Sequence, residues 1–494
     1  MHATLQFDEL HVISDLHLGG AKPFQIFGST DELEALIRHL VQLTPHKQVG
    51  LLINGDFIDF LAEEPKTYFD PDLAVGKLDR ILSDASFKPI FEALQAFVCT
   101  DNRTLVVNLG NHDLELALPW VREHFIQSIC GEDLAATGRL RIVLDGTGVL
   151  CEVGEAKVLC VHGNEVDSWN VTDFERIRRV GRDSQFGKPF EAWIPNAGTQ
   201  MVIDVMNGIK RRYPFVDLLK PEAEGVVPTL LALDPSALQK LQGAAAVAGR
   251  MAWDAARMAT GFLGDAPASA GGVPIVPGRA PGIARRFGAR SQRDARGIIS
   301  EESVRLMELV ENEARRGTDP MDLIGYDQGK QLGLWGATWN LVTGKPASEV
   351  LREALEDLDK DRSFDIAQPD ETFTRLDALI APDIDYVVAG HTHLERALPR
   401  KNGNAWYFNS GTWARLIKIE HDIRQDPAKF ERMFNIFRGG TMDALDAESG
   451  LVIKRCSIVS ICKDETGQTY AELRRMAAGQ TQPQPVADSR YPRS

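Results

Sequence analysis

The stretch that decides the fold is Leu10–Gly19, which reads Leu-His-Val-Ile-Ser-Asp-Leu-His-Leu-Gly. Its first half, Leu10–Ser14, is an apolar and β-branched run that predicts a buried β-strand. Its second half places an aspartate and a histidine directly after that strand. Open α/β sheets bind their ligands at the carboxyl ends of strands. The stretch therefore predicts an α/β sheet with a functional site at its carboxyl edge.

The same pattern of a strand followed by polar residues recurs downstream. The further strands predicted to end in polar clusters are Leu51–Asn54, Thr104–Asn108, Val158–Val161 and Tyr386–Ala389. Amphipathic helices are predicted at Asp31–Leu43 and Ser86–Val98, the first with Ser29 and Glu32 spaced as a capping box. Strands that alternate with helices indicate a layered α/β fold. Three later segments are expected to complete a second sheet packed on the first: Trp406–Asn409, Leu416–Glu420 and Leu451–Ile461.

The region from Trp169 to Ile366 breaks this alternation. Helices are predicted there at Pro235–Phe262 and Ser300–Arg316, from their caps, charges and apolar spacing. Between them, residues 264–296 are rich in Gly, Pro, Ala and Arg and predict irregular chain. The expected domains are a first core part at 1–168, a mainly helical insertion at 169–366, a second core part at 367–476 and a disordered tail at 477–494.

The composition is that of an ordinary globular chain. It has 494 residues, of which 44% are hydrophobic and 25% charged, which excludes a wholly disordered, collagenous or disulfide-scaffold protein. The net charge of −15 weighs against a general nucleic-acid binder, because phosphate backbones need clustered positive charge. It does not weigh against a small phosphorylated substrate held by metal ions.

Compartment signals are sparse. None of the six cysteines forms a CxxC pair, so buried thiols in a reducing compartment are expected. The first residues lack the apolar core of a signal peptide, and no stretch reaches the roughly 18 apolar residues of a membrane span. We therefore expect a cytoplasmic protein.

Five short clusters, one after each of these strands, carry the chemistry. They are Asp15-Leu16-His17, Gly55-Asp56-Phe57-Ile58-Asp59, Gly110-Asn111-His112-Asp113, His162-Gly163 and Gly390-His391-Thr392-His393. They hold five of the 11 histidines, and structural histidines have no reason to prefer strand ends beside Asp, Asn and Gly. Each cluster alone is also compatible with an ordinary turn. Carboxylate, imidazole and amide ligands without thiolate suit Mn, Fe or Zn.

Together and in this order, the clusters resemble the calcineurin-like metallophosphoesterases, whose pattern is DxH, GDxxD, GNH(D/E), H and GHxH. The resemblance covers about residues 8–168 and 380–465. It implies a four-layer αββα sandwich that holds two divalent metal ions, with Mn favoured over Fe or Zn. The metal ligands that it implies are Asp15, His17, Asp56, Asn111, His162, His391 and His393, with Asp56 bridging the two ions.

The resemblance also implies a mechanism and supporting residues. A metal-bridging hydroxide attacks the phosphoryl group. His112 protonates the leaving group or stabilises its charge, and Asp59 orients His112, although Asp59 could instead cap a helix. Asp113 is expected to be a turn or supporting carboxylate outside the site. Phe408–Trp413 resembles a family element that supports the metal loops, and the glycines before Asp56, Asn111 and His391 are expected to allow positive φ.

Departures from the family pattern narrow the class of phosphoesterase that the sequence predicts. Protein Ser/Thr phosphatases of the superfamily have Arg where this chain has Phe60, and Glu where it has Asp113, so a protein phosphatase is not expected. Ile13–Gly19 resembles the bacterial branch that includes UDP-2,3-diacylglucosamine hydrolases. That lipid A enzyme usually has Arg where this chain has His112, which argues against orthology.

We therefore expect hydrolysis of a phosphate ester, with a phosphodiester or pyrophosphate favoured because nothing resembles a monoesterase specificity device. The expected partner is a phosphorylated small-molecule or lipid substrate. A nuclease of the same superfamily is an alternative that the net charge opposes. A non-catalytic protein-binding scaffold is a second alternative, which the complete ligand set opposes.

The insertion is interpreted as a helical cap over the metals. Its two arginine groups either bind phosphate or are solvated; they are Arg176, Arg178, Arg179 and Arg182, and Arg279, Arg285, Arg286, Arg290, Arg293 and Arg296. Pro235–Phe262 is either a buried cap helix or, less favoured, a helix that lines an apolar pocket or meets a membrane surface.

Overall fold

The computed structural model describes residues 5–167, 170–189, 207–210, 212–221, 229–230, 232–233, 346–355, 361–448 and 450–493. The helices predicted at Pro235–Phe262 and Ser300–Arg316 lie outside these residues, as do the irregular stretch and the second arginine group between them. The chain divides into two compact units, the first being Met1–Val226, Leu358–Ala378 and Pro382–Ser494, and the second Val227–Asp357 and Leu379–Ala381. The first unit therefore extends beyond the predicted boundary at residue 168.

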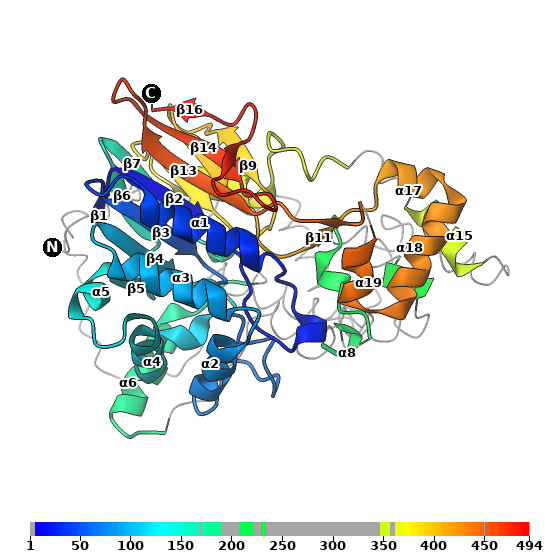
Figure 1. Ribbon diagram of the computed structural model, residues 1–494, viewed down its shortest axis with the longest axis horizontal. Coiled ribbons are helices and arrows are strands. Elements are labelled where there is room, and N and C mark those ends of the chain that lie inside the picture. The colour runs from blue at the N-terminus through cyan, green and yellow to red at the C-terminus, as the bar shows by residue number, and fades with distance from the viewer. Residues whose placement is uncertain are drawn as a thin grey trace, which may run out of the picture. The chain divides into compact units, whose positions relative to one another are not determined.

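The first unit is built on two sheets (Figure 1). The eight-stranded sheet has the order β15-β14-β13-β2-β3-β4-β5, with β16 beside β14. Its strands are β2 (Glu9–Ile13), β3 (Val49–Asn54), β4 (Arg103–Asn108), β5 (Leu140–Val143), β13 (Ser457–Lys463), β14 (Thr469–Arg475), β15 (Gln484–Pro485) and β16 (Tyr491–Pro492). Strands β2 to β5 are parallel, and β13 pairs antiparallel with β2.

The six-stranded sheet has the order β1-β6-β7-β8-β10-β9. Its strands are β1 (Leu5–Phe7), β6 (Val149–Val153), β7 (Ala156–Cys160), β8 (Tyr386–Ala389), β9 (Arg396–Pro399) and β10 (Trp406–Asn409). A separate two-stranded ribbon pairs β11 (Leu416–Ile417) with β12 (Val452–Ile453).

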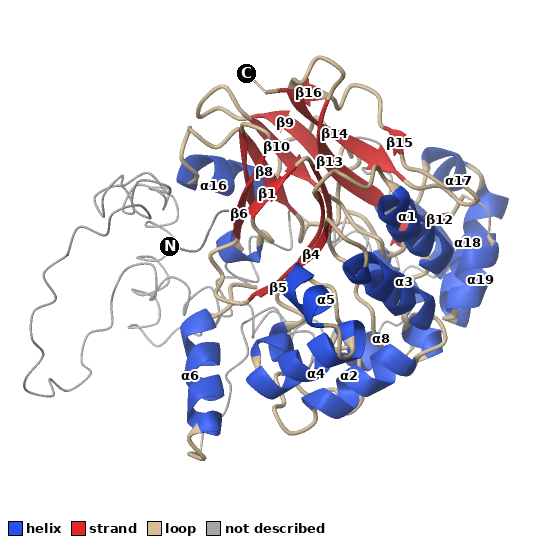
Figure 2. Cartoon of the chain, turned by 60° about the vertical axis from the view of Figure 1, so that its left-hand side comes forward, coloured by secondary structure: helices blue, strands red, loops and turns tan. Residues whose placement is uncertain are grey.

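The helices fall into three groups by their place in the fold. Those beside the eight-stranded sheet are α1 (Thr30–Gln42), α2 (Ala74–Ser83), α3 (Lys88–Cys99), α4 (Pro119–Cys130) and α5 (Leu134–Arg139) (Figure 2). The other helices of the first unit are α6 (Phe174–Gln185), α8 (Asn207–Lys210), α16 (Glu371–Leu379), α17 (His421–Gln425), α18 (Pro427–Gly439) and α19 (Met442–Ala447). Short 3-10 turns are η1 (Lys22–Phe24), η2 (Leu114–Ala117), η3 (Asn164–Val166) and η5 (Val216–Leu218). In the second unit, Ala347–Ala354 forms α15.

Alternating side chains sort the core into layers. Along β2, Val12 points into the cluster between the two sheets, whereas Ile13 joins the cluster under the helices. On the six-stranded sheet, Phe408 points inward, and its neighbour Tyr407 packs against Phe373 of α16 with ring centroids 5.1 Å apart. The order helix, sheet, sheet, helix confirms the predicted αββα fold of the core.

The C-terminal strands correct two expectations. The segment predicted at Leu451–Ile461 does not join the second sheet: β13 extends the first, because Val459 and Ile461 pair with Val12 and Leu10 and share their core. The tail from residue 477 to 493 is not disordered, since β15 and β16 pair with β14 and the Tyr491 ring stacks on Trp406 at 3.8 Å. The tail has few apolar residues, so its composition did not predict this aromatic contact.

A smaller correction concerns the start of α1. Ser29 precedes the helix as predicted, but its side chain makes no capping hydrogen bond. Its φ of −128° and ψ of 42° are not the extended conformation of a capping residue. The segment predicted as a strand at Leu416–Glu420 is also shorter, since only Leu416–Ile417 is a strand.

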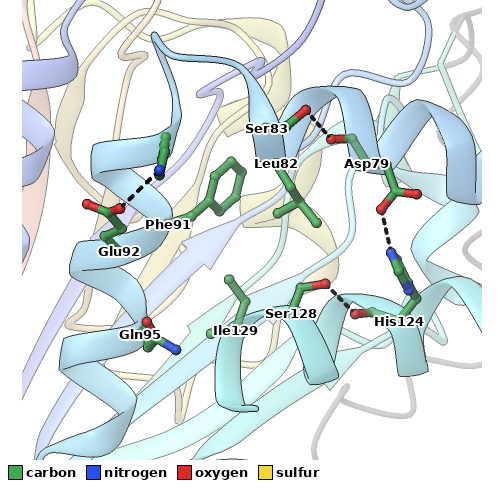
Figure 3. Close-up of a pocket in the computed structure, with 10 residues that line it drawn as sticks. Asp79, Leu82, Ser83, Phe91, Glu92, Gln95, His124, Ser128 and Ile129 are labelled. Carbon is green, nitrogen blue, oxygen red and sulfur yellow. Dashed lines mark hydrogen bonds and ion pairs between the residues drawn. The ribbon is translucent and has the colours of Figure 1, made fainter.

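The helical face carries a surface groove of about 350 Å³ between α2, α3 and α4 (Figure 3). Phe91 and Ile129 form its apolar part, and an ion pair between His124 Nε2 and Asp79 Oδ1 at 2.6 Å lies at its edge. The groove shares no residue with the five polar clusters. Among the described helices, none combines the length and the apolar character that crossing a bilayer requires.

Candidate metal centre

The five polar clusters converge although their strands belong to different sheets. Strands β2, β3 and β4 lie in one sheet, and β7 and β8 in the other. Asn54, the last residue of β3, links them: its side-chain amide donates to the carbonyl of Val161 at 2.7 Å and to that of Val388 at 3.3 Å. The carboxyl ends of the two packed sheets therefore meet, and the clusters meet there with them.

The backbone at this junction is unusually bent. Five of the nine non-glycine residues with positive φ in the described part of the chain are predicted metal ligands: Asp15, His17, Asp56, His391 and His393. Positive φ costs such residues on the order of 1–3 kcal/mol each, and it persists where the surrounding structure fixes it, most often at functional sites. The sequence patterns gave no sign of this strain.

Glycine serves the junction mainly by its small size. Gly55 has a φ of +90°, as expected, but Gly110 and Gly390 do not have positive φ. A Cβ on Gly110 would lie 2.2 Å from Asp56 Oδ1, and one on Gly390 would lie 2.7 Å from Asp15 Oδ2. The expectation of positive φ is therefore wrong for these two glycines, which are needed for close approach to a carboxylate.

Asp15, His17 and His393 form a first group of candidate ligands. The Nε2 atoms of His17 and His393 are 3.1 Å apart, and His393 Nε2 is 3.4 Å from Asp15 Oδ1. Metal–nitrogen bonds of about 2.0–2.1 Å at right angles separate two ligand atoms by about 3 Å. The spacing of this group therefore fits a shared cation.

Asp56, His162 and His391 form a second group. His162 Nδ1–H donates to the carbonyl of Asn54 at 2.8 Å, so Nε2 is the ring nitrogen that faces Asp56. That Nε2 atom lies 3.3 Å from Asp56 Oδ2. Both His162 Nε2 and Asn111 Oδ1 are buried without a hydrogen-bond partner. Because native buried polar atoms are nearly always paired, these two orphaned atoms fit metal coordination.

Asp56 lies between the two groups. Its Oδ2 is 3.3 Å from His162 Nε2 and 3.8 Å from His17 Nε2, whereas its Oδ1 accepts the backbone N–H of His112 at 2.9 Å. Burial opposes its ionisation, yet the charges of His162 and His112 hold the pKa of Asp56 well below its usual value. An ionised carboxylate facing both groups is the geometry that a bridging ligand needs.

His112 and Asp59 form a pair beside these groups. His112 Nδ1–H donates to Asp59 Oδ1 at 3.1 Å, and Asp59 Oδ2 is 3.3 Å from His17 Nδ1. Although burial opposes it, the carboxylates of Asp59 and Asp56 raise the pKa of His112 to about 9. Asp59 also accepts the N–H of Ala62 at 3.0 Å, which is a turn contact. The alternative of a helix cap is not seen, because the next helix begins only at Ala74.

Sequence reasoning missed or set aside several supporting residues. Asp113 accepts the N–H groups of Gly110 at 2.7 Å and Phe57 at 2.9 Å, and so ties two cluster loops together. Burial, then the charge of Asp56, raises the pKa of Asp113 to about 7. Asp167 was not anticipated: its Oδ2 lies 2.8 Å from His391 Nε2. Only its position five residues after His162 could have suggested it.

The element after the fifth cluster supports the loops as expected. Asn409 donates to the carbonyl of Gly390 at 2.7 Å, and Thr412 donates to that of Asp15 at 2.8 Å. Ser410 Oγ lies 2.7 Å from Ser14 Oγ, which in turn donates to Asp15 Oδ2 at 2.5 Å. Asp15 is thus held through its Oδ2 and its carbonyl oxygen. Its Oδ1 accepts the backbone N–H of His391 at 3.2 Å and faces His393 Nε2 at 3.4 Å.

Positive charge near the centre comes from lysines as well as histidines. The charge of Lys210 opposes the rise in the pKa of His112. The charge of Lys220 adds to the effect of burial, which lowers the pKa of His393. In the first arginine group, Arg178 pairs with Glu175 at 2.8 Å and Arg182 with Asp183 at 2.6 Å on the surface of α6. Those two pairs favour the interpretation of Arg178 and Arg182 as solvated side chains.

Comparison with known families agrees with this geometry. Residues 10–213 match the family model described as calcineurin-like phosphoesterase, and no curated protein matches the chain. The match contains four of the five clusters, whereas Gly390–His393 lies beyond it and reaches the same place only through the fold. The match supports the superfamily and indicates a phosphoesterase hydrolase, and the Asp/His groups are compatible with divalent metal binding.

Proposed function

We propose that this chain is a dinuclear metal-dependent hydrolase of a phosphodiester or pyrophosphate. The single observation that carries the proposal is the pair of buried atoms without hydrogen-bond partners, His162 Nε2 and Asn111 Oδ1, beside an ionised Asp56. A buried imidazole nitrogen and a buried amide oxygen without partners each cost free energy unless a ligand pairs with them.

The donor set suggests how two ions would be held. Asp15, His17, His393 and Asp56 would hold one ion. Asn111, His162, His391 and Asp56 would hold the second. All the donors are nitrogen or oxygen, which suits Mn²⁺ best, with Fe or Zn as alternatives. When bound, such a pair of ions supplies a water of lowered pKa and neutralises phosphoryl oxygens.

The remaining chemistry falls to residues of the chain. The Asp59 carboxylate, which accepts the Nδ1–H of His112, favours the protonated form of this imidazole. Asp59 Oδ1 fixes its Nδ1–H, so the other ring nitrogen is the one that would give a proton to the leaving oxygen. Lys210 and Lys220 add positive charge that favours an anionic substrate.

Finer assignments rest on the sequence. Ile13–Gly19 supports a relation to the bacterial branch that includes UDP-2,3-diacylglucosamine hydrolases. His112, in place of that enzyme's usual Arg, argues for a different substrate in the same chemical class. We propose a phosphorylated small molecule or lipid as substrate, and the cytoplasm as the place of action.

The experiment that tests the proposal compares bis-p-nitrophenyl phosphate with p-nitrophenyl phosphate, using protein loaded with Mn²⁺ and assayed for bound metal. Diester turnover that requires the metal supports the proposal. Turnover of the monoester alone would keep the metal centre and overturn the preference for diesters. Two bound equivalents without turnover of either ester, or of a pyrophosphate, would favour the scaffold alternative.

A further inference from the structure

A second group of metal-ligating side chains lies at the opposite end of β2. Glu9, His11 and Cys462 each offer one ligand atom, and these atoms all lie within 4.8 Å of one another. Glu9 and His11 are two residues apart on β2, and Cys462 lies on the adjacent strand β13 (Figure 1). None of the three belongs to the five polar clusters.

Strand register explains why the three side chains meet. His11 pairs with Ser460 and Leu10 with Ile461, so one step further along the ladder Cys462 comes beside Glu9. Alternate residues of a strand share a face, and directly opposed residues share it too. Leu10 and Ile461 point into the core between the sheets, so Glu9, His11 and Cys462 point to the helical side.

The hydrogen bonds of His11 leave one ring nitrogen without a partner. His11 is 2% exposed, and its Nδ1 lies 2.9 Å from Ser460 Oγ. Its Nε2 has no hydrogen-bond partner and lies 3.7 Å from Glu9 Oε2, too far for a hydrogen bond. A buried nitrogen without a hydrogen-bond partner destabilises the folded state. An ion between Nε2, the carboxylate and the thiol would remove that cost.

The distance between His11 and Glu9 and the chemistry of all three donors fit zinc. Tetrahedral bonds of about 2.0–2.3 Å place neighbouring ligand atoms about 3.3–3.5 Å apart, close to the observed 3.7 Å. Mixed imidazole, carboxylate and thiolate ligands select a borderline-soft ion such as Zn²⁺ over Mn²⁺. The Ser460 hydroxyl on Nδ1 is the kind of outer partner that orients a metal-binding imidazole.

We propose that Glu9, His11 and Cys462 form a site for one Zn²⁺ ion, separate from the metal centre at the carboxyl end of β2. Three protein ligands leave one tetrahedral position for water. The ion would join β2 to β13, whose facing residues His11 and Ser460 are 449 positions apart in the chain. Its role is therefore to lock the late strand onto the early one.

The ionisation states of the ligands determine the proton balance. Glu9 pairs with the Lys47 ammonium, whose Nζ lies 2.5 Å from Glu9 Oε1, so Glu9 is a carboxylate. Burial lowers the pKa of His11, which keeps its ring neutral. Burial raises the pKa of Cys462 to about 12, so binding replaces the thiol proton with a sulfur–zinc bond and releases one proton.

Other charges surround the site from every side. Lys47, whose Nζ is 2.5 Å from Glu9 Oε1, and Arg474 of β14 are the cations. Glu472 of β14 adds a second carboxylate, and His39 of α1, whose pKa is lowered by burial, is the nearby titratable group on the helical side. The two carboxylates offset the two cations, so a zinc thiolate adds one net positive charge.

Cobalt binding gives a spectroscopic signal that the carboxyl-end centre, which has no cysteine ligand, cannot produce. The full-length protein is first loaded with Mn²⁺, which fills nitrogen and oxygen sites, and is then titrated with Co²⁺. A thiolate bound to Co²⁺ produces a charge-transfer band in the near ultraviolet, and no cysteine is among the ligands assigned to the carboxyl end. We expect this band at one equivalent of Co²⁺, and competing Zn²⁺ should remove it.

Variants assign the band to its ligands. Cys462→Ser should abolish the band and leave diesterase activity unchanged, and Cys130→Ser, a buried thiol of α4, should keep the band. Glu9→Gln should weaken Co²⁺ binding by about tenfold or more. The proposal is overturned if the Mn²⁺-loaded protein shows no band, or if the band survives in Cys462→Ser. Should that variant not fold, unchanged cobalt affinity in Glu9→Gln overturns it.

Discussion

The two ends of strand β2 both gather metal-ligating side chains, but they do so by different means. At the carboxyl end, Asp15 and His17 have left-handed backbone, with φ of 55° and 50°, and face ligands from four other strands. At the amino end, Glu9 and His11 lie in a regular strand, and a single neighbouring strand supplies Cys462.

The difference teaches what each kind of site requires. Register alone assembles the amino-end group, which needs no bent backbone. The carboxyl-end centre needs strained ligands and buried carboxylates, both of which cost stability and persist only where the fold holds them. Substitutions of the carboxyl-end ligands should therefore change function most. Removal of a nearby buried carboxylate whose pKa is raised should instead stabilise the fold at high pH.

The largest effect is expected from the bridge of the carboxyl-end centre. Asp56→Asn removes a carboxylate that faces both ligand groups, so diester hydrolysis should fall to background and bound Mn²⁺ should decrease by at least one equivalent. Metal analysis and a steady-state assay measure the two quantities. Asp72→Asn, an exposed carboxylate, is the control and should change neither. Retention of activity within about tenfold would show that Asp56 does not bridge.

Removal of the histidine beside the bridge should separate proton transfer from metal binding. His112→Gln should lower kcat by about 10²–10⁴, because general acids contribute that much, while two equivalents of metal remain bound. The loss should be smaller for p-nitrophenol, which leaves without a proton, than for an alkyl leaving group. The exposed His46→Gln serves as the control. Equal losses for both leaving groups would exclude His112 as the acid.

Much of this centre could be predicted from sequence because its ligands lie directly after apolar strands. Runs such as Leu51–Asn54 define both the strand and the place where it ends, so the nine site residues are all near one another in the structure. The sequence did not reveal that β7 and β8 belong to the other sheet, because alternating polarity fixes the face of a strand but not its neighbour.

Other features depend on contacts that no local pattern encodes. Asp167 reaches His391 across more than two hundred residues of chain, and Tyr491 reaches Trp406 from a tail of mostly polar composition. The amino-end group likewise depends on the register between β2 and β13, which only tertiary packing sets. Single side chains that act at long range are therefore what sequence reasoning missed.

Glu115, a buried carboxylate near the carboxyl end of β2, offers a direct measure of what ionising a buried carboxylate costs the folded state. Glu115 is 2% exposed, and burial raises its pKa from 4.5 to about 7 despite the nearby Lys77. The folded state therefore binds a proton more tightly than the unfolded state, and stability is lost as pH rises from about 4.5 through 7. Glu115→Gln should raise the free energy of unfolding at pH 8 by up to about 3 kcal/mol, with little gain at pH 4.5.

Urea unfolding at the two pH values measures this difference. The matched control is Glu123→Gln, an exposed glutamate of α4, which should change stability little at either pH. If Glu115→Gln raised the free energy of unfolding no more at pH 8 than at pH 4.5, the ionisation of Glu115 would not destabilise the folded state. The contrast between the two ends of β2 would then lose its energetic basis, although the geometry would stand.

The smallest effect is expected from substitution of Asp167, which contacts the predicted ligand His391 but is not itself one of the seven predicted metal ligands. Its Oδ2 is 2.8 Å from His391 Nε2, so it can orient the imidazole and fix which ring nitrogen remains for a metal. Asp167→Asn should weaken Mn²⁺ affinity by about 10–100-fold and leave kcat at saturating Mn²⁺ nearly unchanged. The control is Glu175→Gln, an exposed carboxylate on α6. If kcat fell at saturating metal while affinity held, Asp167 would act on the substrate instead, and the carboxyl-end centre would extend beyond its seven ligands.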